Sequence, residues 1–373
     1  MVRRSTGVHY GACSADSPPA AGGRRVRCQA SSGLLGLGRR GALDISIWTD
    51  MRLAPGRMPT AEHYDQMVDL VKLAESLGYH GVWTSEQHGV DDGYLPSQLP
   101  LLAALARETS RLRLATGVLL LPLAQWRRVA EEACTVDLLS HGRLTLGVGL
   151  GHYPHEFRVF GVQREKRADL LEHALRFIRP GLAGRLLPDG LPVGLVPEQQ
   201  HIPLLVAGLA GKAVDRAVRL GDGHFGYSFE DPVATYSELW KQHIEPSLQR
   251  HGRSCEDFRL VAGTMIWVSD SPEKDWHSFV GPAFVYQQQR YADWCADLPS
   301  AAGYNYGSDL KAMLPHVLVG RPAEIRDRLR DLATQVPLHE LVFWARLPGV
   351  PHERASEHLR RFAEEVMPAL SGP

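Results

Sequence analysis

Residues 112–151 contain two apolar runs separated by a helical pattern, and this arrangement constrains the fold more than any other part of the chain. The first run spans 112–121 and is followed by Pro122, whereas the second, 144–151, contains three glycines. Between the runs, apolar residues recur with the spacing of one helix face. Two strands joined by a helix of this length lie parallel and are linked by a right-handed crossover. Glycines at the ends of such strands allow a ligand to approach the backbone closely.

The same alternation of apolar runs and helical patterns continues along most of the chain. The predicted strands are 44–49, 81–84, 112–120, 144–149, 204–208, 223–227, 260–268 and 340–345. The predicted helices are 60–77 (with Thr60 as N-cap), 97–109, 125–139, 165–179, 211–220, 232–250, 322–335 and 352–367. Eight strands with intervening helices predict an α/β fold, a (β/α)8 TIM barrel with insertion segments. A doubly wound sheet would give a similar pattern, but no G-x-G-x-x-G motif joins the first strand to the first helix.

The chain divides by composition into a short first part and a long barrel domain. Residues 1–42 are rich in Gly, Ser, Ala and Arg without hydrophobic periodicity, so we expect a disordered extension ahead of a single domain at 43–373. Seven Arg and one acidic residue in this extension resemble a transit peptide, and a start codon assigned too far upstream explains them equally well. Within the domain, 180–203 and the aromatic-rich 271–315 exceed ordinary connections. We interpret them as insertions that form either a pocket wall or a packing surface.

Charge, hydropathy and cysteine usage exclude several classes of protein. No apolar run reaches the ~20 residues that a membrane-spanning helix needs. Residues 43–373 contain 34 basic and 41 acidic side chains, a net charge of about -7, which argues against nucleic acid as a partner. The five cysteines include no C-x-x-C pair, so we expect reduced thiols and a cytoplasmic location. No metal site is predicted, because Pro154 interrupts the helix that would align His152 and His155.

Candidate functional residues follow the predicted strands, where a (β/α)8 barrel carries its active face. His88 follows the second strand and titrates near neutral pH, so it is a candidate acid or base, although a polar loop residue is the simpler interpretation. Glu86 could orient it or form a structural ion pair. Gly208, Leu209, Ala210, Gly211 and Lys212 link the fifth strand to a helix. Free backbone N–H groups at a helix start bind phosphate, but glycine there is also explained by helix entry alone.

Several ordered segments resemble the bacterial luciferase-like family of flavin-dependent oxidoreductases. The strongest runs from Pro122 to Gly149 and contains A-E-E-A-x₃-D-L-L-S-x-G-R-L-x-L-G-V-G. Others are W-T-x-E-x-H at 83–88, A-V-D-R-A-V-R-L-G-D-G at 213–223 and G-R-P-A-E-I at 320–325. The resemblance extends from about residue 42 to residue 370 and identifies the superfamily without identifying one reaction.

The resemblance implies a barrel that binds reduced FMN, or the deazaflavin coenzyme F-420, at the carboxyl-terminal ends of the strands. It implies a non-proline cis peptide at Gly117–Val118, next to Thr116, against the flavin ring. It also implies that Gly149 and Leu150 lie near the edge of the isoalloxazine. The family's phosphate-binding loop corresponds to Gly208, Leu209, Ala210, Gly211 and Lys212.

One departure affects the chemistry that the resemblance implies. The family's two consecutive histidines after Glu86 are Gln87 and His88 here, and Gln87 cannot act as a base. Three hypotheses follow: a two-component monooxygenase that uses O₂ and reduced FMN from a separate flavin reductase, an F-420-dependent hydride-transfer enzyme, and a non-catalytic flavin-binding paralogue. A small organic substrate and a homodimer are the remaining expectations.

Overall fold

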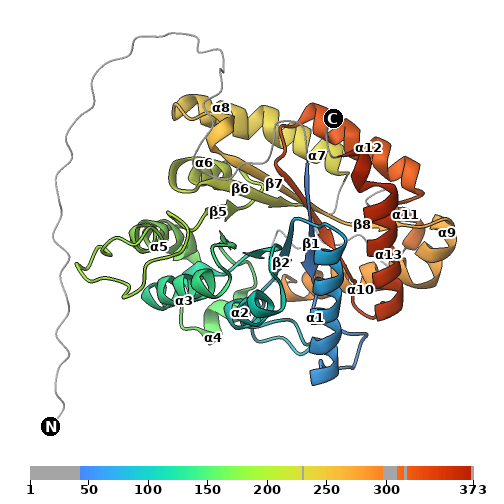
Figure 1. Cartoon of the computed structure of the whole chain (residues 1–373), viewed down its shortest axis with the longest axis horizontal. Coiled ribbons are helices and arrows are strands. Elements are labelled where there is room, and N and C mark those ends of the chain that lie inside the picture. The colour runs from blue at the N-terminus through green and yellow to red at the C-terminus, as the bar shows by residue number, and fades with distance from the viewer. Residues whose placement is uncertain (1–42, 229–230, 297–308, 315–316, 371–373) are drawn as a thin grey trace. The chain divides into compact units, whose positions relative to one another are not determined.

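Eight parallel strands close into a barrel in the computed structural model, which describes residues 43–228, 231–296, 309–314 and 317–370 (Figure 1). Around the barrel the strands follow the order β1, β10, β7, β6, β5, β4, β3 and β2. Their bounds are β1 Asp44–Thr49, β2 Gly81–Thr84, β3 Arg113–Thr116, β4 Leu144–Val148, β5 Leu204–Ala207, β6 Gly223–Tyr227, β7 Arg259–Thr264 and β10 Glu340–Trp344. The predicted (β/α)8 barrel is therefore confirmed.

Seven helices begin and end within two residues of their predicted bounds. They are α1 Ala61–Ser76, α2 Gln98–Glu108, α3 Trp126–Leu139, α5 Arg167–Gly181, α6 Gly211–Leu220, α12 Pro322–Gln335 and α13 His352–Glu365. Thr60 caps α1 as predicted, because its side chain accepts a hydrogen bond from the backbone N–H of His63. Helix α13 packs against α1 on one side and α12 on the other, as Figure 1 shows.

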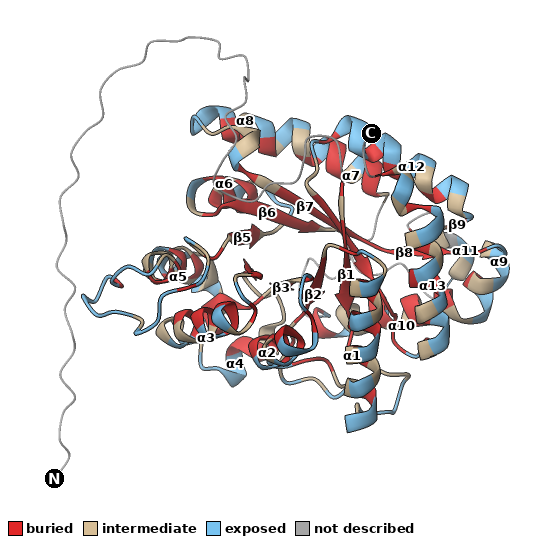
Figure 2. Ribbon diagram, in the orientation of Figure 1, coloured by how far each residue is buried: buried red, intermediate tan, exposed pale blue. Residues whose placement is uncertain are grey.

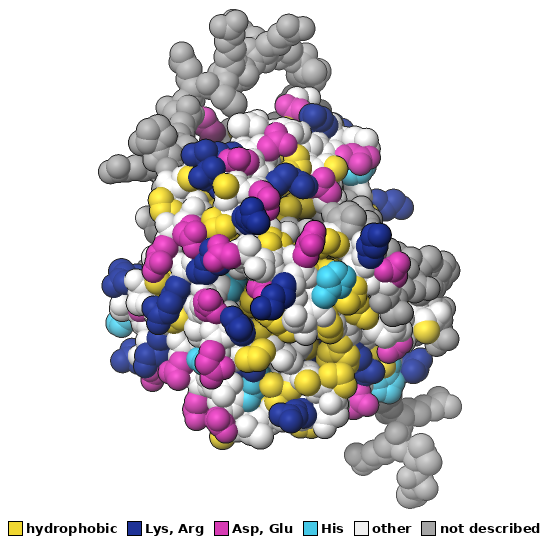
Figure 3. All heavy atoms as spheres, turned by 90° about the vertical axis from the view of Figure 1, so that its right-hand side faces the viewer, with side chains coloured by type: hydrophobic (Ala, Val, Ile, Leu, Met, Phe, Trp, Pro, Cys, Tyr) yellow, Lys and Arg dark blue, Asp and Glu magenta, His cyan; other side chains and the backbone are white. Residues whose placement is uncertain are grey.

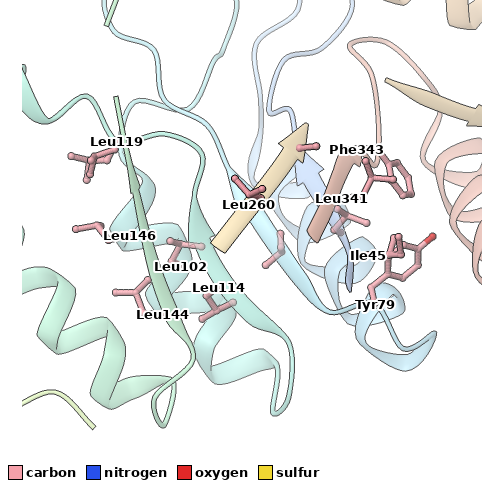
Figure 4. Close-up of a cluster of buried hydrophobic side chains, with 14 of the residues drawn as sticks. Ile45, Tyr79, Leu102, Leu114, Leu119, Leu144, Leu146, Leu260, Leu341 and Phe343 are labelled. Atoms are coloured by element: carbon pink, nitrogen blue, oxygen red, sulfur yellow. The ribbon is translucent and has the colours of Figure 1, made fainter. Parts of the chain in front are cut away.

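The strands are buried on both faces, which is why their sequences read as apolar runs (Figure 2). Successive side chains of a strand point to opposite faces. In β10, Leu341 and Phe343 belong to the cluster between barrel and helices, which Figure 4 shows, whereas Val342 and Trp344 belong to the barrel interior. The helices are thus held by one apolar layer, and the interior forms a second.

The predicted strand 112–120 is too long, because β3 ends at Thr116. Leu114 and Ala115 pair with Leu144 and Thr145 of β4, and a further bridge joins Leu119 to Val148. One more residue separates Ala115 from Leu119 than separates Thr145 from Val148, so the ladder is interrupted as it is at a β-bulge. Apolar periodicity does not reveal such an interruption.

The predicted strand 260–268 is also wrong, because the structure divides it between two sheets. β7 ends at Thr264, and β8 (Ile266–Val268) pairs with β9 (Leu318–Gly320) in a separate two-stranded parallel sheet. Strand β9 was not predicted. An unbroken apolar run cannot indicate where the chain leaves one sheet for another, since both halves are buried.

The remaining predictions differ from the structure in smaller ways. The predicted helix 232–250 contains α7 (Pro232–Leu239), a π-helical turn and α8 (Glu245–Arg250). Residues 182–203, all of them described, form neither helix nor strand. The segment 271–315 contains α9 Pro272–Asp275, a π-helical turn Trp276–Val280, α10 Gly281–Trp294 and α11 Leu310–Met313. Tyr304, Tyr306 and the predicted extension 1–42 lie outside the described residues.

A charged cluster fills the amino-terminal end of the barrel interior. The Glu340 carboxylate accepts hydrogen bonds from Arg259 (2.9 Å) and from the Trp83 indole N–H (2.7 Å). Burial raises the pKa of Glu340, but Arg259 and the hydrogen-bond donors outweigh it and lower that pKa to about 2. This end of the barrel is therefore closed by a structural ion pair.

The outer surface carries charges of both signs. Lys and Arg side chains are interspersed with Asp and Glu on the face in Figure 3. Among the described helices, none combines the length and the apolar character required to cross a bilayer.

Candidate active site

The ends of β3 and β4 form the floor on which the family resemblance places a flavin ring. The Gly117–Val118 peptide is cis, at the position that the resemblance implies. The Gly117 N–H donates to the Thr84 carbonyl and lies 3.3 Å from the side-chain oxygen of Gln98. Gly117 is buried and Val118 is half-buried.

Glycine is required at two further positions of this floor. A Cβ atom on Gly147 would lie 2.1 Å from the Thr116 carbonyl oxygen, and one on Gly149 would lie 2.5 Å from a methyl carbon of Val118. The backbones of β3 and β4 therefore approach more closely than side chains permit. Gly117, Val118 and Gly149 therefore pack closely at the ends of these strands, and we call this group of residues the glycine floor.

Thr116 and Leu150, which also belong to the predicted cofactor site, contact other parts of the protein. The Thr116 hydroxyl donates to the Gly147 carbonyl at 2.7 Å, and the side chain is fully buried. Thr116 thus supports the floor from beneath instead of offering a hydroxyl above it. Leu150 is half-buried and packs against the apolar layer. Their predicted roles next to the isoalloxazine stay predictions.

Glu86 and His88 form a pair in the loop after β2. The His88 Nε2 atom lies 3.1 Å from a Glu86 carboxylate oxygen, which also accepts from the Leu120 N–H at 3.1 Å. Gln98, the first residue of α2, donates to the other Glu86 oxygen at 3.1 Å. Glu86 therefore orients His88 and also ties the β2 loop to the chain that follows the cis peptide.

The environment of His88 favours its charged form. Burial lowers the pKa of the imidazole, but the hydrogen bond and negative charge of Glu86 outweigh that effect and raise it. The His88 ring also packs edge-on against Phe160, with ring centroids 4.7 Å apart. His88 is thus a half-buried group with a defined orientation, as an acid or base requires.

Glu156 is a further acidic group at this loop. It lies in α4 (Pro154–Val159), which begins at Pro154, so no helix carries both His152 and His155. Its carboxylate accepts from the His88 backbone N–H at 2.8 Å, and the buried Gln87 lies beside it. Burial raises the pKa of Glu156 to about 7. The sequence interpretation considered Glu156 only with His152 and His155, because no local pattern joins α4 to the β2 loop.

The predicted phosphate loop leads directly into α6. Gly208 has φ +136°, a conformation that favours glycine, and its carbonyl oxygen lies 2.6 Å from the His224 ring nitrogen. No side chain caps α6, and among the described contacts the backbone N–H groups of Gly211 and Lys212 have no partner. Because this loop follows β5, these donors and the exposed Lys212 lie at the same end of the barrel as the glycine floor. Such an end suits an anion.

His243 is a basic residue beside the phosphate loop that sequence reasoning missed. It lies in the π-helical turn Trp240–Ile244, and its Nδ1 atom is 3.0 Å from where a Cβ on Gly211 would be. The turn is separated from Gly211 by more than a strand and a helix along the chain. The only available signal was an unassigned histidine within a helical pattern.

A buried ion pair joins α10 to the barrel mouth. Asp50 and Arg52 follow β1, and two guanidinium nitrogens bind the carboxylate at 2.9 and 2.6 Å. Gln287 of α10 donates to the same carboxylate at 2.9 Å. The Arg52 guanidinium also lies over three aromatic rings, those of Tyr94, Tyr291 and Trp294, at 4.5–5.8 Å from their centroids. Helix α10 is therefore anchored beside the carboxyl-terminal end of β1, and the pocket-wall interpretation of the 271–315 insertion stays a prediction.

Metal-ligating side chains do not converge in this region. Among the described residues, no three His, Cys, Asp or Glu side chains are arranged to hold a metal ion. His152 and His155 are no exception, because α4 begins between them.

The sequence matches the model of a known protein family. The model of the luciferase-like monooxygenase family matches residues 43–339. The chain belongs to the luciferase-like monooxygenase family. This luciferase-like chain is 25% identical over 356 residues to the oxygenase component of the flavin-dependent trigonelline monooxygenase of Acinetobacter baylyi, covering 87% of this chain and 95% of the relative.

Solved structures share the luciferase-like fold. The oxygenating constituent of 3,6-diketocamphane monooxygenase from Pseudomonas putida, in complex with FMN, matches with a TM-score of 0.70 and 17% identity, covering 89% of this chain and all of that one. An F420-dependent secondary alcohol dehydrogenase matches with a TM-score of 0.68 and 15% identity, covering 88% and 99%. At 17% and 15% identity these structures support the barrel fold alone, and they do not indicate whether this chain binds FMN or F-420.

Proposed function

We propose that this chain is the oxygenase component of a two-component, flavin-dependent monooxygenase that acts on a small organic substrate. The observation that carries the proposal is the glycine floor, where Gly149 cannot carry a side chain because Val118 lies 2.5 Å from its Cβ position. Closely packed glycines near an uncapped helix start would suit the two ends of FMN, a planar ring and a phosphate. Membership in the luciferase-like family supports this assignment.

The residues present fit FMN at both ends. Gly117, Val118 and Gly149 would lie against the isoalloxazine. The N–H groups of Gly211 and Lys212 would donate to the phosphate, with Lys212 adding positive charge. His243 lies at the same helix start. Reduced FMN supplies the activation of O₂, and the protein supplies binding and orientation.

The chain's own residues have separate tasks in this proposal. Helix α10, held by Asp50 and Arg52, would cover the mouth and exclude water from the ring. Because Glu86 holds His88 through Nε2, His88 would donate or accept a proton at Nδ1, the other ring nitrogen. Glu156 would hold the His88 backbone in place. Since Gln87 cannot transfer protons at neutral pH, His88 would take the acid–base role.

The partner and assembly complete the proposal. A separate reductase would supply reduced flavin, as the words "oxygenase component" in the trigonelline relative's name indicate for that protein. We infer a homodimer from the family resemblance, and size-exclusion chromatography with light scattering tests it directly.

One titration separates the monooxygenase from its alternatives. Under anaerobic conditions the protein is titrated with reduced FMN and, separately, with reduced F-420, and O₂ uptake is then followed with a panel of apolar and aromatic compounds. We expect reduced FMN to bind and ¹⁸O from ¹⁸O₂ to enter a product. Binding of F-420 without FMN would indicate hydride transfer, and FMN binding without turnover of any compound would indicate a non-catalytic paralogue. His88→Ala should lower turnover far more than FMN affinity.

A further inference from the structure

Three tryptophans line the barrel interior, and one of them has an indole N–H without a partner. Trp83 donates to Glu340 at 2.7 Å, and Trp344 donates to the Tyr227 hydroxyl at 2.7 Å. Trp48 is only 5% exposed, yet within the described part of the chain its Nε1 atom has no hydrogen-bond partner. A buried donor without an acceptor is destabilising and is uncommon in folded proteins.

The Trp48 ring is fixed by its neighbours. It stacks on Trp344 with centroids 4.2 Å apart and planes 5° from parallel. The rings of Phe225 and Tyr227 contact it edge-on, at 5.3 and 4.9 Å. Because rings enclose it in two directions, the indole cannot rotate within the barrel to find an acceptor.

The unpartnered N–H lies at the glycine floor. The Cε2 atom of Trp48, to which Nε1 is bonded, is 3.5 Å from the position of a Cβ on Gly117. The opposite edge of the indole, at Cζ3, is 3.2 Å from the corresponding position of Gly263 in β7. The ring therefore spans the barrel mouth from β7 to β3 and presents its donor edge beside the Gly117–Val118 peptide.

We propose that the Trp48 indole N–H is a cofactor-binding group that donates a hydrogen bond to the isoalloxazine of bound FMN. Flavin rings carry carbonyl oxygens and ring nitrogens that accept such bonds, and a ring bound at Gly117 would lie next to this donor edge, since Trp48 Cε2 is 3.5 Å from the Gly117 Cβ position. The inference rests on the proposed function, because it requires a flavin at Gly117. It also explains why this donor has no partner among the described residues.

Substitution and NMR test the inference together. Trp48→Phe keeps an aromatic ring and removes the N–H, and Trp267→Phe is the control, since Trp267 is a buried tryptophan of β8 stacked on His358 (4.4 Å) outside the barrel. We expect Trp48→Phe to weaken FMN binding by about 3- to 10-fold, the range for one lost hydrogen bond. We expect Trp267→Phe to leave FMN binding unchanged. If Trp48→Phe does not fold, Trp48→Tyr replaces it.

The indole ¹H–¹⁵N spectrum of the wild-type protein supplies a second readout. We expect the Trp48 resonance to move downfield when FMN is added, as a new hydrogen bond requires. Unchanged affinity in Trp48→Phe, or weaker binding with a stationary Trp48 resonance, would overturn the inference while FMN binding stands. Wild-type protein that binds no FMN would overturn the proposed function itself.

Discussion

The backbone N–H of His88 donates to the Glu156 carboxylate at 2.8 Å, so a short helix after β4 holds the loop that follows β2. The two residues are 68 positions apart in the chain. Since Glu86 binds the His88 ring, the residue is held at both its backbone and its side chain. Because the Glu156 carboxyl is ionisable, the stability of this contact depends on pH.

Replacing Glu156 by glutamine should change how stability depends on pH. The pKa of Glu156 is raised in the folded protein to about 7, above its ordinary value, so the native state binds the extra proton and stability falls as pH rises from about 4.5 to about 7. Gln is neutral throughout. Glu156→Gln should therefore be more stable than wild type at pH 8, by up to ~3 kcal/mol, and nearly equal at pH 5. Urea unfolding at both pH values measures this.

The exposed Glu353 of α13 provides the matched control. Glu353→Gln should shift stability little at either pH, because a solvated carboxyl contributes little. Equal effects of the two substitutions at pH 8 would contradict a special environment for Glu156.

Adding a methyl group at Gly149 should damage the glycine floor. The new Cβ would lie 2.5 Å from Val118, so the two strands must shift apart. We expect Gly149→Ala to lose ~1–3 kcal/mol of stability and to bind FMN at least tenfold more weakly. Calorimetry and fluorescence titration measure the two effects.

A second substitution tests the cause. Val118→Ala removes the methyl group that Gly149→Ala would meet, so the double variant should recover stability beyond the sum of the single effects. If the two stability changes simply add in the double variant, the contact between residues 118 and 149 is not the cause of the destabilisation by Gly149→Ala.

Substitution of Lys212 should separate the contribution of the phosphate to FMN binding from that of the flavin ring. Lys212→Ala should weaken FMN binding by about 5-fold and leave riboflavin binding unchanged, because only FMN carries the phosphate. Lys274→Ala in α9 controls for net charge. If FMN and riboflavin lose affinity equally, the phosphate does not lie at α6.

Removing Arg52 should loosen α10. Asp50 would then be a buried carboxylate that keeps hydrogen bonds from the backbone N–H of residue 52 (3.0 Å) and from Gln287 (2.9 Å) but loses its counter-charge, and loss of one partner of a buried pair costs about 3–5 kcal/mol. Hydrogen exchange of Gly281–Trp294 should accelerate in Arg52→Leu more than that of α6. Asp50→Asn combined with Arg52→Leu should restore part of the protection. Uniform acceleration across the protein would indicate global destabilisation instead.

The periodicity of residues determined much of the fold. Apolar runs alternating with helical patterns predicted every strand of the barrel, because a strand that is buried on both faces has a continuous apolar sequence. The predicted strand ends were wrong where contacts with distant parts of the chain set them. These are Thr116, where the ladder with β4 is interrupted, and Met265, where the chain moves to a second sheet. The family resemblance, not periodicity, placed the cis peptide at Gly117–Val118.

The tertiary structure decided which groups surround the site. Glu156 with His88, His243 with Gly211, and Gln287 with Asp50 are pairs that only barrel closure brings together. Their energies depend on distance and burial, and neither quantity is encoded in a short stretch of residues. Trp48 is the clearest case, because its sequence position predicts a core residue, while only the packed barrel shows that its N–H has no acceptor among the residues that the structure describes.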